Sequence, residues 1–147
     1  MNDAAQIGTA LASARTIAVV GCSPNPDRPS NAIARYLLEQ GYDVIPVNPG
    51  HRRILGETCY SSLAEIPRDV QIDIVDVFRR SDSVAPVAEQ AIARGAGFFF
   101  MQQGVVDADS ARRLEAAGIP VAMDRCILVE HASRGIGRRN FGETRQR

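Results

Sequence analysis

Residues 16–30, with the sequence TIAVVGCSPNPDRPS, decide the fold of this chain. The run 16–20 is short, apolar and mostly β-branched, and it ends at Gly21. Such a run is typical of a parallel strand whose two faces are both covered by helices. A loop with three prolines then leads to Ser30, a residue type that caps helices, and an amphipathic segment follows it. This order of strand, tight loop and helix predicts the first unit of an α/β domain.

The same alternation of strand and helix continues to about residue 132. The expected strands cover residues 16–21, 42–47, 72–78, 97–101 and 120–123, and the expected helices cover 3–14, 30–40, 83–94, 107–117 and 126–132. Alternating elements with short links form a parallel sheet with right-handed crossovers. The fold class is therefore α/β, a Rossmann-like, doubly wound, five-stranded parallel sheet in three α/β/α layers. By analogy with that class we expect the strand order 3-2-1-4-5.

Composition places the chain among ordinary globular proteins. It has 147 residues, 45% of them hydrophobic, and zero formal net charge, so no charge excess points to nucleic acid or to a membrane surface. The three cysteines form no C-x-x-C pair, and no apolar run reaches the roughly 20 residues of a membrane helix. The N-terminus lacks the pattern of a signal peptide. We expect a cytoplasmic protein with one domain over residues 1–132 and a mobile basic tail over 133–147, its oligomeric state left open.

The loops after the expected strands predict a binding site. In an open α/β sheet, ligands bind outside the carboxyl ends of the strands, beside the first strand. In the first of these loops Gly21 lets the backbone pass close to a ligand, and Arg28 adds a positive charge. A helix that begins near Ser30 points unpaired N–H groups at the same space, which favours an anion. The loop therefore predicts a phosphate-bearing nucleotide, although Gly21 and the prolines have the alternative role of shaping a stiff, tight turn.

This loop departs from the known dinucleotide and phosphate-loop fingerprints. The second and third glycines of G-x-G-x-x-G are missing, and no G-K-[ST] occurs. Asn48 and Pro49 stand where an NAD-binding acidic residue is expected. Cys126 and His131 lie five positions apart on an expected helix, so they do not share a face. We predict neither a catalytic residue nor a metal site.

Several spaced blocks carry a resemblance to a known family. They are Gly21-x-Ser23 with Arg28-Pro29-Ser30, Gly41-Tyr42 with Asn48-Pro49, Val75-Asp76-Val77-Phe78-Arg79-Arg80, Gln102-x-Gly104-Val105 and Met123-Asp124-Arg125-Cys126. In these blocks the chain resembles the small bacterial and archaeal CoA-binding proteins, over about residues 12 to 132. That family is similar to the CoA-binding domain of the succinyl-CoA synthetase α subunit. Phe100 stands where relatives often carry Trp, and Cys22 where Ala is usual.

The resemblance implies coenzyme A as the ligand, with its nucleotide end in the loop 21–30. The implied pyrophosphate contacts are Gly21, Cys22, Ser23, Arg28 and Ser30, with Ser30 also capping the helix. Asn48 and Pro49 would line the adenosine side of the site. Phe78, Arg79 and Arg80 end the third expected strand, and one of the two arginines would reach the phosphates. Gln102, Gln103 and Gly104 would contact the pantetheine arm.

The resemblance also limits the activity that we expect. The phosphohistidine of the synthetase lies outside its CoA-binding domain, so ligase activity is not implied. We predict a non-catalytic module that binds coenzyme A or an acyl-CoA, a small molecule rather than nucleic acid or membrane. The alternative is an enzyme that acts on an acyl-CoA or another nucleotide, and an NAD(P)-dependent oxidoreductase is the least favoured reading.

Overall fold

A computed structural model describes residues 1–141 of the chain, and its centre is a parallel sheet. The five strands are β1 (Thr16–Val20), β2 (Asp43–Val47), β5 (Ile74–Val77), β6 (Phe98–Met101) and β7 (Val121–Met123). Each pair of neighbours is parallel. Each strand lies within two residues of its expected bounds, so the predicted α/β class with a five-stranded sheet is confirmed.

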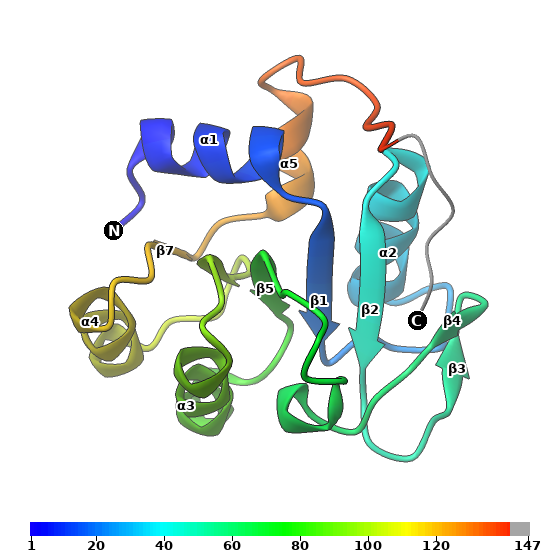
Figure 1. Cartoon of the computed structure of the whole chain (residues 1–147), viewed down its shortest axis with the longest axis horizontal. Coiled ribbons are helices and arrows are strands. Elements are labelled where there is room, and N and C mark those ends of the chain that lie inside the picture. Colours follow the sequence, from blue (N-terminus) through cyan, green and yellow to red (C-terminus); the bar gives the residue numbers. More distant parts are fainter. Residues whose placement is uncertain (142–147) are drawn as a thin grey trace.

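The expected strand order, 3-2-1-4-5, is wrong. The sheet has the order β2-β1-β5-β6-β7, which is 2-1-3-4-5 in chain order (Figure 1). The long connection after β2 returns across β1, and β5 pairs with the free side of β1 instead of extending the sheet beyond β2. The sheet therefore reverses its direction of growth between β1 and β5. The ligand crevice of such a sheet is expected at the ends of these two strands.

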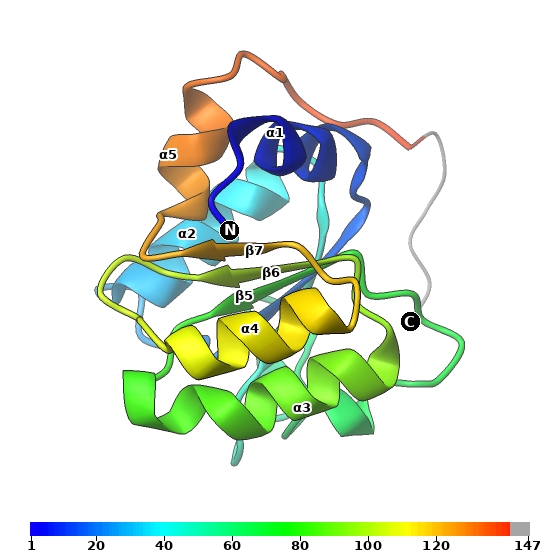
Figure 2. The same ribbon diagram turned by 90° about the vertical axis from the view of Figure 1, so that its left-hand side faces the viewer.

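Helices cover both faces of the sheet, as Figure 2 shows. One layer holds α1 (Ala4–Ser13), α2 (Pro29–Glu39) and α5 (Ile127–Ala132), and the other holds α3 (Val84–Arg94) and α4 (Ala108–Ala116). Right-handed crossovers require α2 to lie on the opposite face from α3 and α4, because the strands after β1 and after β5 are added in opposite directions. All five helices lie within one residue of their expected bounds. Gly95 ends α3 in the left-handed conformation, which glycine adopts readily.

Alternate residues of β1 serve the two helical layers. Ile17 and Val19 pack with the buried residues of α1 and α2, whereas Ala18 and Val20 pack with those of α3 and α4. Successive side chains of a strand point to opposite faces, so a strand covered on both faces is apolar without interruption. All of β1 is buried, which explains why this run determined the fold class.

The connection between β2 and β5 contains short elements in addition to the expected strands and helices. A two-stranded antiparallel hairpin forms from β3 (Arg53–Ile54) and β4 (Glu57–Thr58), and a short 3-10 helix, η1 (Leu63–Glu65), follows. A second 3-10 helix, η2 (Ser81–Ser83), leads directly into α3. Leu63 packs into the core on the α3 side, so this connection covers the sheet where no long helix does.

The segment after α5 lies along the domain. Ile136 packs against the core cluster on the α1 and α2 side, and an Arg134 Nη2 donates to the Ala4 carbonyl at 3.2 Å. The Arg139 N–H donates to the Gln40 carbonyl. Residues 142–147 of the expected tail lie outside the described residues, and the boundary at residue 132 stays a prediction. Over residues 1–141, none of the helices has both the length and the apolar character that crossing a membrane requires.

Candidate binding site at the carboxyl edge of the sheet

The ends of β1, β2 and β5 are tied together at Gly21. The Gly21 N–H donates to the Val47 carbonyl at 2.8 Å, and the Phe78 N–H donates to the Val20 carbonyl at 2.8 Å. Gly21 has a φ of +84°, a conformation that favours glycine. A Cβ built at this position would lie 2.2 Å from the Phe78 carbonyl oxygen. The glycine is therefore required by the neighbouring strand, and contact of its backbone with a ligand stays a prediction.

The loop 21–30 is braced by its own side chains. The Ser30 hydroxyl accepts from the Ser23 N–H at 2.9 Å, and the Asn31 amide donates to the Ser23 carbonyl at 2.8 Å. The Ser23 hydroxyl accepts from the Asn25 N–H at 3.0 Å. These bonds hold the loop in one shape before any ligand binds, and preorganised loops bind with a smaller entropic cost.

The predicted capping role of Ser30 is wrong. The N-cap of α2 is Arg28, no side chain caps it, and Pro29 occupies the first turn. Ser30 lies inside the helix, where its hydroxyl turns back to the Ser23 N–H. Proline suits the first helical position because its missing N–H has no intrahelical partner there. The chain thus starts α2 with Pro29 and uses Ser30 to close the loop.

Asn48 joins the second loop to the first. Its side-chain amide donates to the Cys22 carbonyl at 2.7 Å, and its backbone N–H donates to the Tyr60 carbonyl at 2.9 Å. Cys22 itself is fully buried, and burial, followed by the nearby Cys59 and Asp76, raises the pKa of its thiol to about 12. The Cys22 thiol is therefore a neutral core group rather than a reactive one.

The predicted pantetheine contacts have different surroundings. Gln102 is buried, and its side-chain amide donates to the Asp76 carboxyl group, which is itself fully buried. Burial raises the pKa of Asp76 to about 7, and the bond from Gln102 opposes that shift. The Gly104 N–H donates to the Asp124 carboxylate at 2.7 Å. Of the three predicted residues, only Gln103 presents an exposed side chain at this edge.

The predicted cationic side chains differ in exposure. Arg28 is exposed, and within residues 1–141 its guanidinium has no hydrogen bond or ion pair. Pro49, the predicted contact after β2, is exposed as well. Arg80 is exposed and pairs with Asp82 at 3.0 Å. Arg79 is half-buried, and its Nε is buried with no acceptor among the described residues. Arg79 therefore keeps part of its hydrogen-bonding capacity for another group.

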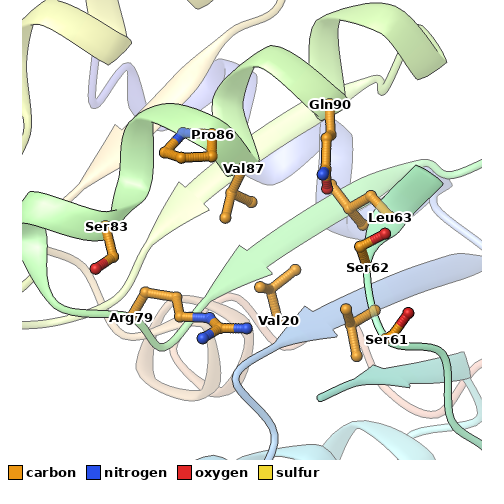
Figure 3. A pocket seen from close by; sticks show the side chains of 10 residues that line it. Val20, Ser61, Ser62, Leu63, Arg79, Ser83, Pro86, Val87 and Gln90 are labelled. Carbon is orange, nitrogen blue, oxygen red and sulfur yellow. The ribbon is translucent and has the colours of Figure 1, made fainter. Parts of the chain in front are cut away.

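A cavity of about 250 Å³ lies at the ends of β1, β2 and β5, between η1 and α3 (Figure 3). Its lining residues are Val20, Val47, Ser61, Ser62, Leu63, Arg79, Ser83, Pro86, Val87 and Gln90. The sequence analysis named only Arg79 of these. The pair Ser61-Ser62 was the signal for two of the remaining polar residues, but the expected strand order placed the connection that carries it beyond β2, away from the end of β1.

Several arrangements bear on catalysis and metals. His131 is buried against Tyr36, whose hydroxyl lies 2.7 Å from its Nδ1, and against Tyr42, which precedes β2 at the opposite edge of the sheet. Burial also raises the pKa of the Cys59 thiol. Within residues 1–141, no group of three or more His, Cys, Asp or Glu side chains is placed to hold a metal ion.

Comparisons with known proteins identify the family to which this chain is similar. A family model described as a CoA binding domain matches residues 15–132. The YneT protein of Bacillus subtilis (strain 168), itself uncharacterized, is 44% identical over 128 residues, covering 87% of this chain and 93% of YneT. A solved structure of a hypothetical protein from Pyrococcus horikoshii OT3 has a TM-score of 0.84 and 36% identity, covering 89% of this chain and 91% of that one.

A ligase is also similar over part of the chain. An ADP-forming acetate–CoA ligase of Archaeoglobus fulgidus is 38% identical over 63 residues, which are 43% of this chain and 9% of the ligase. The similarity therefore concerns one segment of a much longer protein.

Proposed function

The chain belongs to the CoA binding domain family, and we propose that it binds coenzyme A or an acyl-CoA across the carboxyl edge of its sheet. The observation that carries the proposal is the position of two cationic side chains beside the end of β1. Arg28 follows β1 on the side of α2, and Arg79 lines the cavity on the side of α3. Coenzyme A carries phosphate groups at separate positions, and guanidinium groups bind phosphate with paired hydrogen bonds.

The first loop supplies the site for the pyrophosphate in this proposal. It begins at Gly21 and ends at the first turn of α2, and the partial positive charge at the amino end of this helix favours an anion. The internal bonds of Ser23 and Ser30 support a loop that needs little rearrangement on binding. Pro49 and Phe78 border the same edge from β2 and β5 and would contact the apolar parts of the ligand.

A non-catalytic role is the form of the proposal that we favour. The thiols of Cys22 and Cys59 have raised pKa values because they are buried, which is the reverse of an activated nucleophile. His131 is engaged with Tyr36 near the amino edge of the sheet. Such a protein would hold or sense a CoA compound rather than transform it.

Calorimetric titration of the whole chain with CoA, acetyl-CoA, NAD and ATP tests this function. We expect binding of CoA and acetyl-CoA with clearly weaker binding of NAD and ATP. Tight binding of NAD without binding of CoA would overturn the proposal. Incubation with acetyl-CoA, followed by assay of free thiol, tests for transfer of the acetyl group to water, which an acyl-CoA hydrolase catalyses and a binding module does not.

A further inference from the structure

The cavity between η1 and α3 has the lining of an anion site. Among the described residues that line it, Arg79 is the one charged side chain, and none is a carboxylate. The hydroxyls of Ser61 and Ser62 and the amide of Gln90 offer further hydrogen bonds, and Ser83, whose hydroxyl donates to the Asp82 carboxylate at 3.3 Å, lines the same cavity. The remaining lining residues are apolar, so an interaction with Arg79 is less screened there than on open surface.

The Arg79 guanidinium suits a ligand that carries hydrogen-bond acceptors. Its Nε is buried, and no acceptor of residues 1–141 bonds to it. The next residue, Arg80, is exposed and already paired with Asp82 at 3.0 Å. In Figure 3 the Arg79 side chain extends toward Val20, with Ser83 near its base and Ser61 and Ser62 beyond its tip. The Arg79 side chain thus extends along the cavity.

The end of α3 adds to the preference for negative charge. Ser83 is the N-cap of α3, and no side chain caps it. Ser83, Pro86 and Val87 line the cavity, so the first turn of the helix borders it. The amino end of a helix carries a partial positive charge, which favours an anion within about one turn.

The size and place of the cavity select the part of the ligand that fits. A volume of about 250 Å³ is smaller than the roughly 300–1,000 Å³ of pockets that enclose a drug-sized molecule. It therefore suits a fragment of coenzyme A. Val20 lines the cavity and directly precedes the loop 21–30. A nucleotide whose pyrophosphate binds in that loop would therefore bring its ribose next to Arg79.

We propose that Arg79, Ser61, Ser62 and Ser83 form a subsite for a phosphate monoester, which receives the 3′-phosphate of coenzyme A. This assignment rests on the proposed function and deepens it. A phosphate monoester carries between one and two negative charges at neutral pH and offers three acceptor oxygens, which matches a guanidinium surrounded by hydroxyls. NAD and 3′-dephospho-CoA lack that group, so the subsite would select CoA against both.

The test compares CoA with 3′-dephospho-CoA by calorimetry on the whole chain. We expect the natural protein to bind CoA roughly 10- to 100-fold more tightly. Arg79→Gln removes this preference, because it weakens CoA to the affinity of dephospho-CoA and leaves dephospho-CoA unchanged. Arg80→Gln is the matched control and keeps the preference. Thermal melting of each variant establishes that it is folded.

A second variant covers the case in which Arg79→Gln does not fold. Ser62→Ala combined with Ser83→Ala keeps Arg79 and removes two hydroxyls, and it should weaken CoA more than dephospho-CoA. Equal binding of the two ligands by the natural protein overturns the subsite while leaving the proposed function in place. If neither ligand binds, the proposed function fails. Titration with adenosine 3′-monophosphate then decides the subsite, because Arg79-dependent binding supports it and no binding overturns it.

Discussion

Gly21 and Phe78 approach so closely that the carbonyl oxygen of Phe78 occupies the place where a side chain at position 21 would begin. A Cβ there would lie 2.2 Å from that oxygen, at a φ of +84°. The contact joins the end of β1 to the end of β5, the two strands between which the sheet reverses direction. The geometry of the proposed binding edge therefore depends on one position without a side chain.

Gly21→Ala should destabilise the fold by more than about 3 kcal/mol, because the left-handed backbone alone costs an L-residue roughly 1–2 kcal/mol and the clash with a backbone oxygen adds to it. Gly118→Ala is the matched control, since Gly118 also has a φ of +84° but no atom within 4 Å of a built Cβ. Urea unfolding of both variants measures the difference. Equal losses of stability would show that the Phe78 contact is unimportant.

Asp73→Ala should cost about 1–3 kcal/mol of stability through unpaired backbone donors. One carboxylate oxygen of Asp73 accepts from the N–H groups of Arg15 and Thr16, each at 3.0 Å, and so anchors the start of β1. Asp69→Ala, at an exposed position of the preceding turn, should change little. An Asp73→Ala variant as stable as the natural protein would contradict this role.

Asp76→Asn should remove a pH dependence of stability. Burial raises the folded-state pKa of Asp76 to about 7 from 3.8, so only the unfolded chain ionises between these values. The contribution of Asp76 to stability is complete below about pH 4 and is lost as the pH rises to about 7, by an amount on the order of 4 kcal/mol.

Urea midpoints at several pH values between 4 and 8 measure this effect. The stability of Asp76→Asn minus that of the natural chain should rise across the window and level off above pH 7. An amide preserves the volume and accepts the bond from Gln102, so other titrations cancel in the difference. A difference that does not vary with pH would place the titration elsewhere.

Arg28→Ala should weaken CoA binding about 10- to 100-fold, because a charge-assisted hydrogen bond contributes about 1.5–3 kcal/mol. Arg112→Ala is the control, since Arg112 is exposed on α4 and pairs with Asp109 at 3.2 Å. Both variants should melt at the temperature of the natural protein. A loss below about twofold on Arg28→Ala would remove this residue from the site.

The class of the fold follows from local sequence patterns. The run 16–20 is buried on both faces, and a strand in that setting must be apolar at every position, so burial is written directly into composition. The position at which α3 ends, Gly95, follows an equally local rule. The blocks that carry the family resemblance also lie in the loops that meet at one edge, because parallel strands share their carboxyl edge.

The order of the strands and the partners of the buried polar groups depend on how the whole chain packs. Nothing local in residues 48–73 states on which side of β1 the chain returns, since both sides offer the same backbone donors and acceptors. That choice brings Val20, at the end of β1, into the cavity that Ser61, Ser62 and Arg79 also line. It also sets β5 against β6, where Asp76 meets Gln102. Likewise, Ser30 is a capping residue by type, but the path of the loop gives its hydroxyl to the Ser23 N–H instead. Such contacts join residues distant in sequence, and the packing of the whole chain selects them.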